Sequence, residues 1–88
     1  AEERAIALME EAERLLEPPL SQKTKIALSH FHDHVKREQL ELAWDAITEA
    51  GAQAGAPPAF WRCLRDAASL MGLEEQSAEA VRRGRAAQ

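Results

Sequence analysis

Apolar side chains recur every three to four residues along almost the whole chain, the spacing of helices that bury one face in a core. Prolines and glycines interrupt this pattern at Pro18-Pro19, at Gly51 and Gly55, at Pro57-Pro58 and at Gly72. The pattern predicts an all-α fold, a compact bundle of four to five short helices in one domain, 1–88. The expected helices cover approximately residues 2–16, 21–35, 38–53, 58–71 and 75–85, with Gly51 and Gly55 ending the third.

No glycine or proline separates the second expected helix from the third, so one long helix over residues 21–54 has to be considered. The apolar stripes of the two segments differ in direction by about 150° when each residue turns the helix by about 100°. A straight helix would therefore place its two apolar halves on nearly opposite sides. We expect a turn between Val35 and Gln39 that aligns both stripes toward one core.

Composition narrows the class of protein. With 45% hydrophobic and 30% charged residues, the 88-residue chain is too apolar for a disordered one. Its single cysteine, Cys63, excludes an internal disulfide and a four-cysteine zinc site. No apolar run approaches the roughly 18–20 residues of a membrane span, and acids stand where a signal peptide needs bases. These features predict a cytoplasmic protein that does not enter a membrane.

The charges are unevenly distributed. Fifteen acids against eleven bases give a net charge of −4, which argues against direct binding to nucleic acid. Residues 38–56 contain four acids and no base: Glu38, Glu41, Asp45 and Glu49. On a helix the last three repel one another by roughly 0.2–0.5 kcal/mol per adjacent pair. This pattern indicates either a surface for a basic partner or a solvated face balanced by Lys23, Lys25 or Arg62 of a neighbouring helix.

Three histidines cluster in the second expected helix. His30 and His34 stand one turn apart and Asp33 is close by, so this spacing makes a weak candidate for a divalent metal. Two histidines form only half of a site, and a solvated helix end explains them more simply, so no metal or other cofactor is expected. His32 lies toward the apolar face beside Leu28 and is expected to be partly buried.

No residue set for catalysis is evident. The chain lacks a glycine-rich phosphate loop and a serine elbow, and Cys63 lies among apolar neighbours as a core residue would. We therefore expect a protein that is not an enzyme. Trp44 is expected in the core, whereas Trp61 lies off the main apolar stripe and is expected to be an exposed anchor for a partner.

The order of marked residues over positions 21–74 resembles a known family. The chain reads S-x-x-T-K-x-x-L-S-H-F-x-D-H, then L-E-L-A-W-D-A-I, then P-P-A-F-W-x-x-L-R-x-A-A-x-L-M-G-L. This pattern resembles the small all-helical immunity proteins of bacterial polymorphic toxin systems, especially the Maf-type immunity family. The chain departs from the family pattern at a longer, basic hinge before the second motif.

The resemblance implies a non-enzymatic immunity protein that binds and neutralises a cognate toxin domain. Such toxins are often nucleases with basic clefts, so the expected partner has a basic surface. From their face and charge, we expect the contacting residues to be Asp33, Glu38, Glu41, Asp45, Glu49 and Trp61. Two alternatives remain open: a helical adaptor or self-associating subunit such as a homodimer, and a metal-responsive regulator that uses His30 and His34.

Overall fold

The computed structural model describes residues 2–87, and these residues form five α-helices and no strand. The helices are α1 (Glu2–Arg14), α2 (Gln22–Lys36), α3 (Leu40–Ala54), α4 (Pro58–Leu70) and α5 (Glu74–Ala86). The predicted all-α fold is confirmed, and each observed helix begins and ends within two residues of its expected range. No described helix is both long and apolar enough to cross a bilayer.

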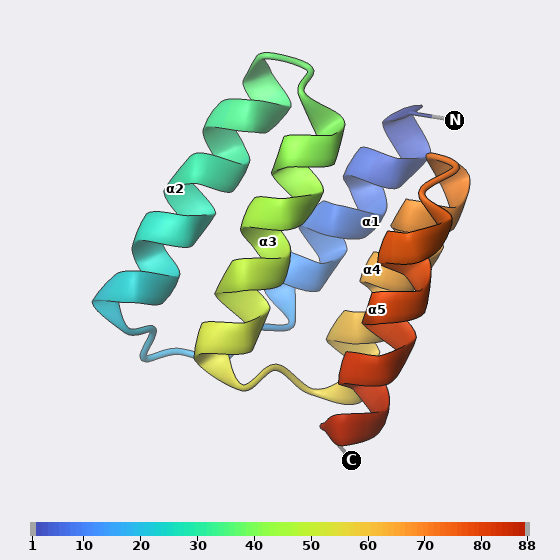
Figure 1. The fold of residues 1–88 in the computed structure, drawn as a ribbon. Helices are drawn as coiled ribbons and strands as arrows, with labels where there is room; N and C mark the ends of the chain where they lie inside the picture. The colour runs from blue at the N-terminus through green and yellow to red at the C-terminus, as the bar shows by residue number, and fades with distance from the viewer. Residues whose placement is uncertain (1, 88) are drawn as a thin grey trace.

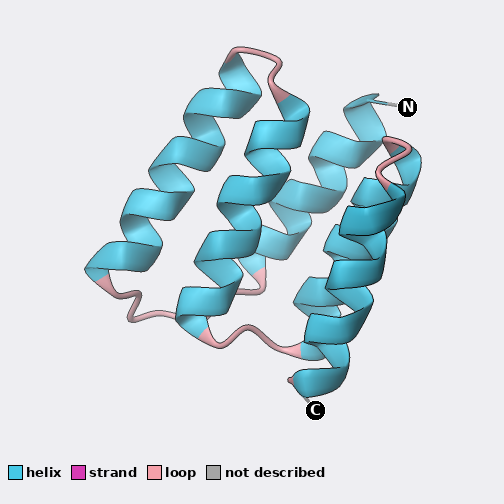
Figure 2. Cartoon of the chain, viewed as in Figure 1, coloured by secondary structure: helices cyan, strands magenta, loops and turns pink. Residues whose placement is uncertain are grey.

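The helices form two antiparallel pairs, α2 with α3 and α4 with α5, while α1 packs mainly on α4 (Figure 1). Short loops join the helices (Figure 2). The Cα atoms span 32 × 28 × 17 Å, so the bundle is flattened. In a flat bundle this small, a central helix buries one side and leaves another in water.

The core brings apolar side chains from all five helices together. The largest fully buried side chains are those of Trp44, Phe31, Phe60, Met9, Ile47, Leu64 and Thr24. Trp44 Nε1 donates a hydrogen bond of 2.9 Å to the carbonyl oxygen of Leu64, which joins α3 to α4 inside the core. This bond satisfies the one polar atom of a fully buried indole.

The expected break between the second and third helices lies at residues 37–39. The amide of Gln39 donates to the carbonyl of His34, and the amide of Glu38 donates to the carbonyl of Val35. This pair of bonds is the Schellman arrangement that ends a helix, and it requires a left-handed residue between helix and loop. Glu38 occupies that position with φ of 59°, which costs a residue with a side chain about 1 kcal/mol or more relative to glycine.

The third helix ends at Gly55, whose φ is 63°, but the prediction that Gly51 helps to end it is wrong. Gly51 lies inside α3 and is buried. A Cβ atom at this position would overlap the ring of Phe60 from α4. Glycine is therefore required here by the close approach of an aromatic ring rather than by a helix end.

We predict that Gly51→Ala destabilises the protein by about 1–3 kcal/mol, because the added methyl group overpacks the core against Phe60. An ordinary helical glycine would instead gain up to about 1 kcal/mol from the same change. Urea unfolding measures the difference. The double variant with Phe60→Leu should lose less than the sum of the two single variants, and a stabilised Gly51→Ala protein would contradict the packing.

Candidate functional site

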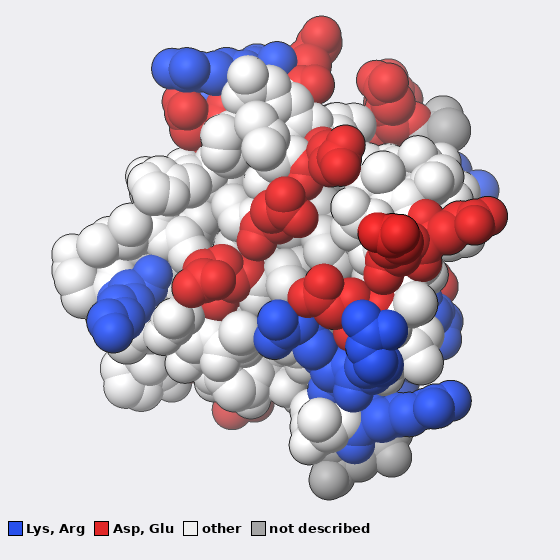
Figure 3. All heavy atoms as spheres, in the orientation of Figure 1, with Lys and Arg blue, Asp and Glu red and all other residues white. Residues whose placement is uncertain are grey.

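Three acidic side chains form a line along the exposed side of α3. Glu41, Asp45 and Glu49 are all exposed, whereas Trp44 and Ile47 on the opposite side of the helix are buried. We call these three residues the acidic row. Figure 3 shows it as a continuous line of acidic side chains along α3. The row exists because the apolar residues of α3 turn its other side into the core.

No base of the described chain neutralises the acidic row. Within residues 2–87, the ion pairs shorter than 4.0 Å are His32–Glu13, Arg37–Asp33, Arg65–Asp66 and Arg83–Glu79. The only side-chain hydrogen bond to the row in this part of the chain comes from Gln53 Nε2 to Glu49 Oε1, at 3.1 Å. Lys23, Lys25 and Arg62, the bases considered for balancing this face, form no ion pair with it in the described structure.

Asp45, at the middle of the row, experiences the negative field directly. Partial desolvation, together with the charges of Glu41 and of Glu79 on α5, raises the pKa of the Asp45 carboxyl above its ordinary 3.8. The effect of Glu79 on the pKa of Asp45 was not expected from the sequence. Its pairing with Arg83, at 2.9 Å, offsets only part of this charge. The four-residue spacing within α3 predicts the repulsion between Glu41 and Asp45. The effect of Glu79 depends on the packing of the bundle, which brings α5 near Asp45.

Two other expected contact residues lie near the turn between α2 and α3. Glu38 is exposed and lies three residues before Glu41, and the two line the same surface pocket. Asp33 is exposed as well, but its Oδ2 pairs with Arg37 Nε at 3.3 Å. Asp33 therefore offers a partner less uncompensated charge than the acidic row does.

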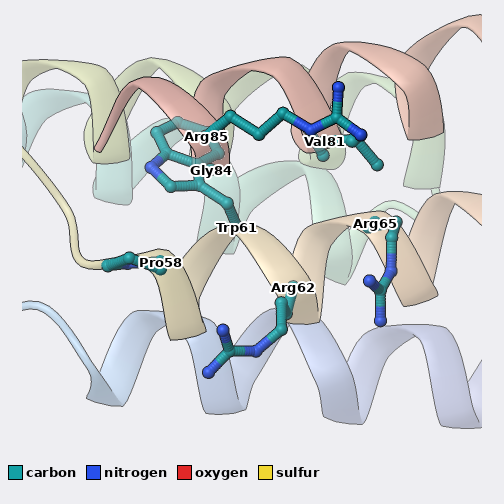
Figure 4. Close-up of a pocket in the computed structure, with 8 residues that line it drawn as sticks. Pro58, Trp61, Arg62, Arg65, Val81, Gly84 and Arg85 are labelled. Atoms are coloured by element: carbon teal, nitrogen blue, oxygen red, sulfur yellow. The ribbon is translucent and has the colours of Figure 1, made fainter. Parts of the chain in front are cut away.

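The prediction that Trp61 is an exposed anchor is wrong, because only 4% of this residue is accessible. Its ring rises from α4 toward α5, beside Gly84 (Figure 4). Phe60 packs edge-on against it at a centroid distance of 4.8 Å, and the Arg83 guanidinium lies 5.6 Å from the ring centroid. The small residue at position 84 admits the indole between the two helices, a contact that α4 alone does not reveal.

Arginines from α4 and α5 line a groove of about 250 Å³ around Trp61, a second feature that the sequence did not reveal. Arg62 and Arg65 extend from α4, whereas Arg85 runs along α5 (Figure 4). Bases distant in the sequence thus gather beside this helix pair.

The histidines do not form a three-ligand site. His32 was expected to be partly buried, but its side chain is exposed and its Nε2 lies 2.9 Å from both carboxylate oxygens of Glu13, linking α2 to α1. His34 Nδ1 pairs with Gln39 Oε1 at 2.9 Å, and His30 is exposed. In the described part of the chain, no three His, Cys, Asp or Glu side chains are placed to hold a metal ion.

Cys63 is half-buried on α4. Desolvation, with smaller contributions from Glu11 and Asp66, raises the pKa of its thiol above the ordinary value, although Arg62 opposes the shift. Because the thiolate is the nucleophilic form, this environment weakens the cysteine as a nucleophile.

Comparisons with protein-family models, with curated proteins and with solved structures give no match.

We predict that Asp45→Asn stabilises the protein at pH 7 by about 0.5 kcal/mol or less, after solvent screening, because the variant removes a charge that is partly desolvated and repelled by its neighbours. A raised pKa means that the folded state holds this proton more tightly than the unfolded state. Ionisation of the Asp45 carboxyl therefore lowers the free energy of unfolding as pH rises above the ordinary pKa of 3.8. The advantage of the variant should disappear as pH falls to about 3.8.

Urea unfolding at pH 7 and near pH 3.5 checks this prediction. Glu10→Gln is the control, because Glu10 is an exposed carboxylate of α1 that forms no ion pair among residues 2–87. A loss of stability in Asp45→Asn at pH 7, or an equal gain in the control, would contradict a repelled Asp45.

Proposed function

We propose that this protein is a non-enzymatic immunity protein that acts in the bacterial cytoplasm by binding and neutralising a cognate toxin domain. The partner presents a basic surface to α3, and inhibition requires one copy of this protein for each toxin. The resemblance over residues 21–74 suggests this class of function. The observation that carries the proposal is the exposed acidic row, which has no neutralising base in residues 2–87.

A row of like charges on one helix destabilises the fold by a few tenths of a kcal/mol per adjacent pair. A basic partner removes this penalty on binding, and opposite charges across an interface speed association and select the partner. Glu38 supports the same interpretation. Its left-handed backbone conformation would suit glycine better, yet the residue there carries another acid beside Glu41.

In this proposal the acidic side chains bind the toxin and catalyse no reaction. A carboxylate row can occupy a cleft that normally holds phosphates, because both present anionic oxygens to Lys and Arg side chains. Glu41, Asp45 and Glu49 recur every fourth residue, so they lie about 6 Å apart along the helix axis. The three carboxylates therefore fall within about 12 Å of helix axis, short enough to enter one cleft together, which supports competition with a nucleic acid substrate.

We predict that the protein captures a basic, toxic domain from a lysate of its source, and that co-expression of the two removes the toxicity. Charge reversal of the acidic row, Glu41→Lys with Asp45→Lys and Glu49→Lys, should reduce affinity at least about 100-fold. Capture by the unaltered protein should weaken as salt rises to about 0.5 M. Titration of toxin activity with purified protein should end at a one-to-one ratio.

The matched control reverses three exposed acids of α1 and the following loop, Glu3, Glu10 and Glu17, which changes the net charge by the same amount. This control should keep capture and protection. If both triple variants lose capture equally, only the net charge matters and the acidic row is not the binding surface. If the captured domain stays active in a one-to-one complex, the proposed inhibition is wrong.

A further inference from the structure

A pocket of about 420 Å³, lined by both apolar and acidic side chains, opens at the end of the bundle where the acidic row begins. Figure 1 shows that the α2–α3 turn, the α4–α5 turn and the start of α1 all lie at this end. The apolar lining comes from Leu40, Leu70, Met71 and Leu73. Leu70 is 37% exposed, so part of its apolar side chain is open to a partner.

All the ionisable residues that line this pocket are acidic: Glu2, Glu38 and Glu41. No lysine, arginine or histidine contributes to its lining. Glu41 is also the first member of the acidic row, so the pocket and the row form one continuous surface. The pocket therefore combines apolar side chains with carboxylates that attract cations and repel anions.

We propose that this pocket is the anchor point of the interface, where it takes an apolar side chain that is flanked by Lys or Arg in a basic segment of the partner. The proposal rests on the proposed function and names the chemistry that the partner presents. Exposed ion pairs alone contribute little to affinity, because water and salt screen them. An apolar side chain buried within a ring of charge pairs supplies the affinity, and the charges exclude segments of the wrong sign.

The pocket also takes over the role that the sequence analysis gave to Trp61. Trp61 is buried between α4 and α5 and has little surface to offer. An interface built on this face therefore takes its apolar part from the loop residues Met71 and Leu73 and from the ends of α3 and α4. The large side chain comes from the partner and the cavity from this protein, the reverse of the initial expectation.

Two synthetic peptides test the pocket on the unaltered protein. One is acetyl-Lys-Lys-Leu-Lys-Lys-amide, and the other has glycine in place of leucine. At about 20 mM salt, NMR titration should show the leucine peptide binding at least about tenfold more tightly. The shifts that it induces should concentrate on the methyl groups of Leu40, Leu70, Met71 and Leu73.

Leucine substitutions provide a matched pair of variants. Leu70→Asn removes apolar lining from the pocket, whereas Leu42→Asn changes a leucine of α3 that is 47% exposed and lies outside the pocket. Leu70→Asn should reduce the preference for the leucine peptide to less than about twofold, and Leu42→Asn should leave it intact. Thermal unfolding of both variants checks that they fold. The comparison of the two peptides on the unaltered protein does not depend on either variant.

Equal binding of the two peptides, or shifts centred on Leu42, would overturn the anchor pocket. The failure is distinguishable from failure of the proposed function. If Leu70→Asn still captures and neutralises the toxin while reversal of the acidic row abolishes capture, the immunity function stands and the anchor lies elsewhere. If the peptides discriminate as expected but no toxic domain is captured, the pocket stands and the immunity function falls.

Discussion

The contact between Trp44 and α4 determines which side of α3 faces water. The Trp44 indole is fully buried, and its N–H donates to the carbonyl oxygen of Leu64. The backbones of α3 and α4 approach each other at few other points. The Trp44 side chain is therefore one of the main contacts between the α2–α3 pair and the rest of the bundle. With Trp44 held in the core, Glu41, Asp45 and Glu49 have only the opposite side of the helix available.

The periodic features of the fold were predictable from the sequence. The five helices follow from apolar spacing, and the change of stripe direction places the turn between Val35 and Gln39. Gly72 was expected just beyond a helix end, and its φ of 74° agrees. These features depend on neighbouring residues of one segment, so local rules describe them well.

The errors concern contacts between residues of different helices. Gly51 has the sequence context of a helix end, yet it makes room for Phe60, nine residues later. Trp61 lies off the apolar stripe of its own helix, but Gly84 of α5 admits its ring. His32 was expected against the core, whereas it reaches out to Glu13 of α1. In each case the neighbouring helix decides burial, and helical periodicity carries no information about that helix.

The features of the candidate site likewise fall into those that the sequence predicts and those that depend on the packing of the helices. The acidic row could be predicted, because its members share one helix. The influence of Glu79 and the pocket formed by Leu40, Leu70, Met71 and Leu73 could not, because they require α5 and the α4–α5 turn to pack beside α3. The structure also separates charge by region. Arginines line the α4–α5 groove around Trp61, and unpaired acids run along α3 (Figures 3 and 4). The two surfaces therefore carry electrostatic potentials of opposite sign.

The central claim is that the acidic row carries repulsion that no base among residues 2–87 relieves. The most direct measurement is the free energy of unfolding as a function of salt, for the unaltered protein and for the variant Glu41→Gln, Asp45→Asn, Glu49→Gln. At about 20 mM salt the variant should be more stable by about 0.5–1 kcal/mol, and this advantage should shrink at about 0.5 M, where salt screens the repulsion but not the desolvation of Asp45. A variant that is less stable at low salt would mean that the row is already neutralised, and an advantage that does not change with salt would mean that repulsion does not cause it. Either result would contradict the claim.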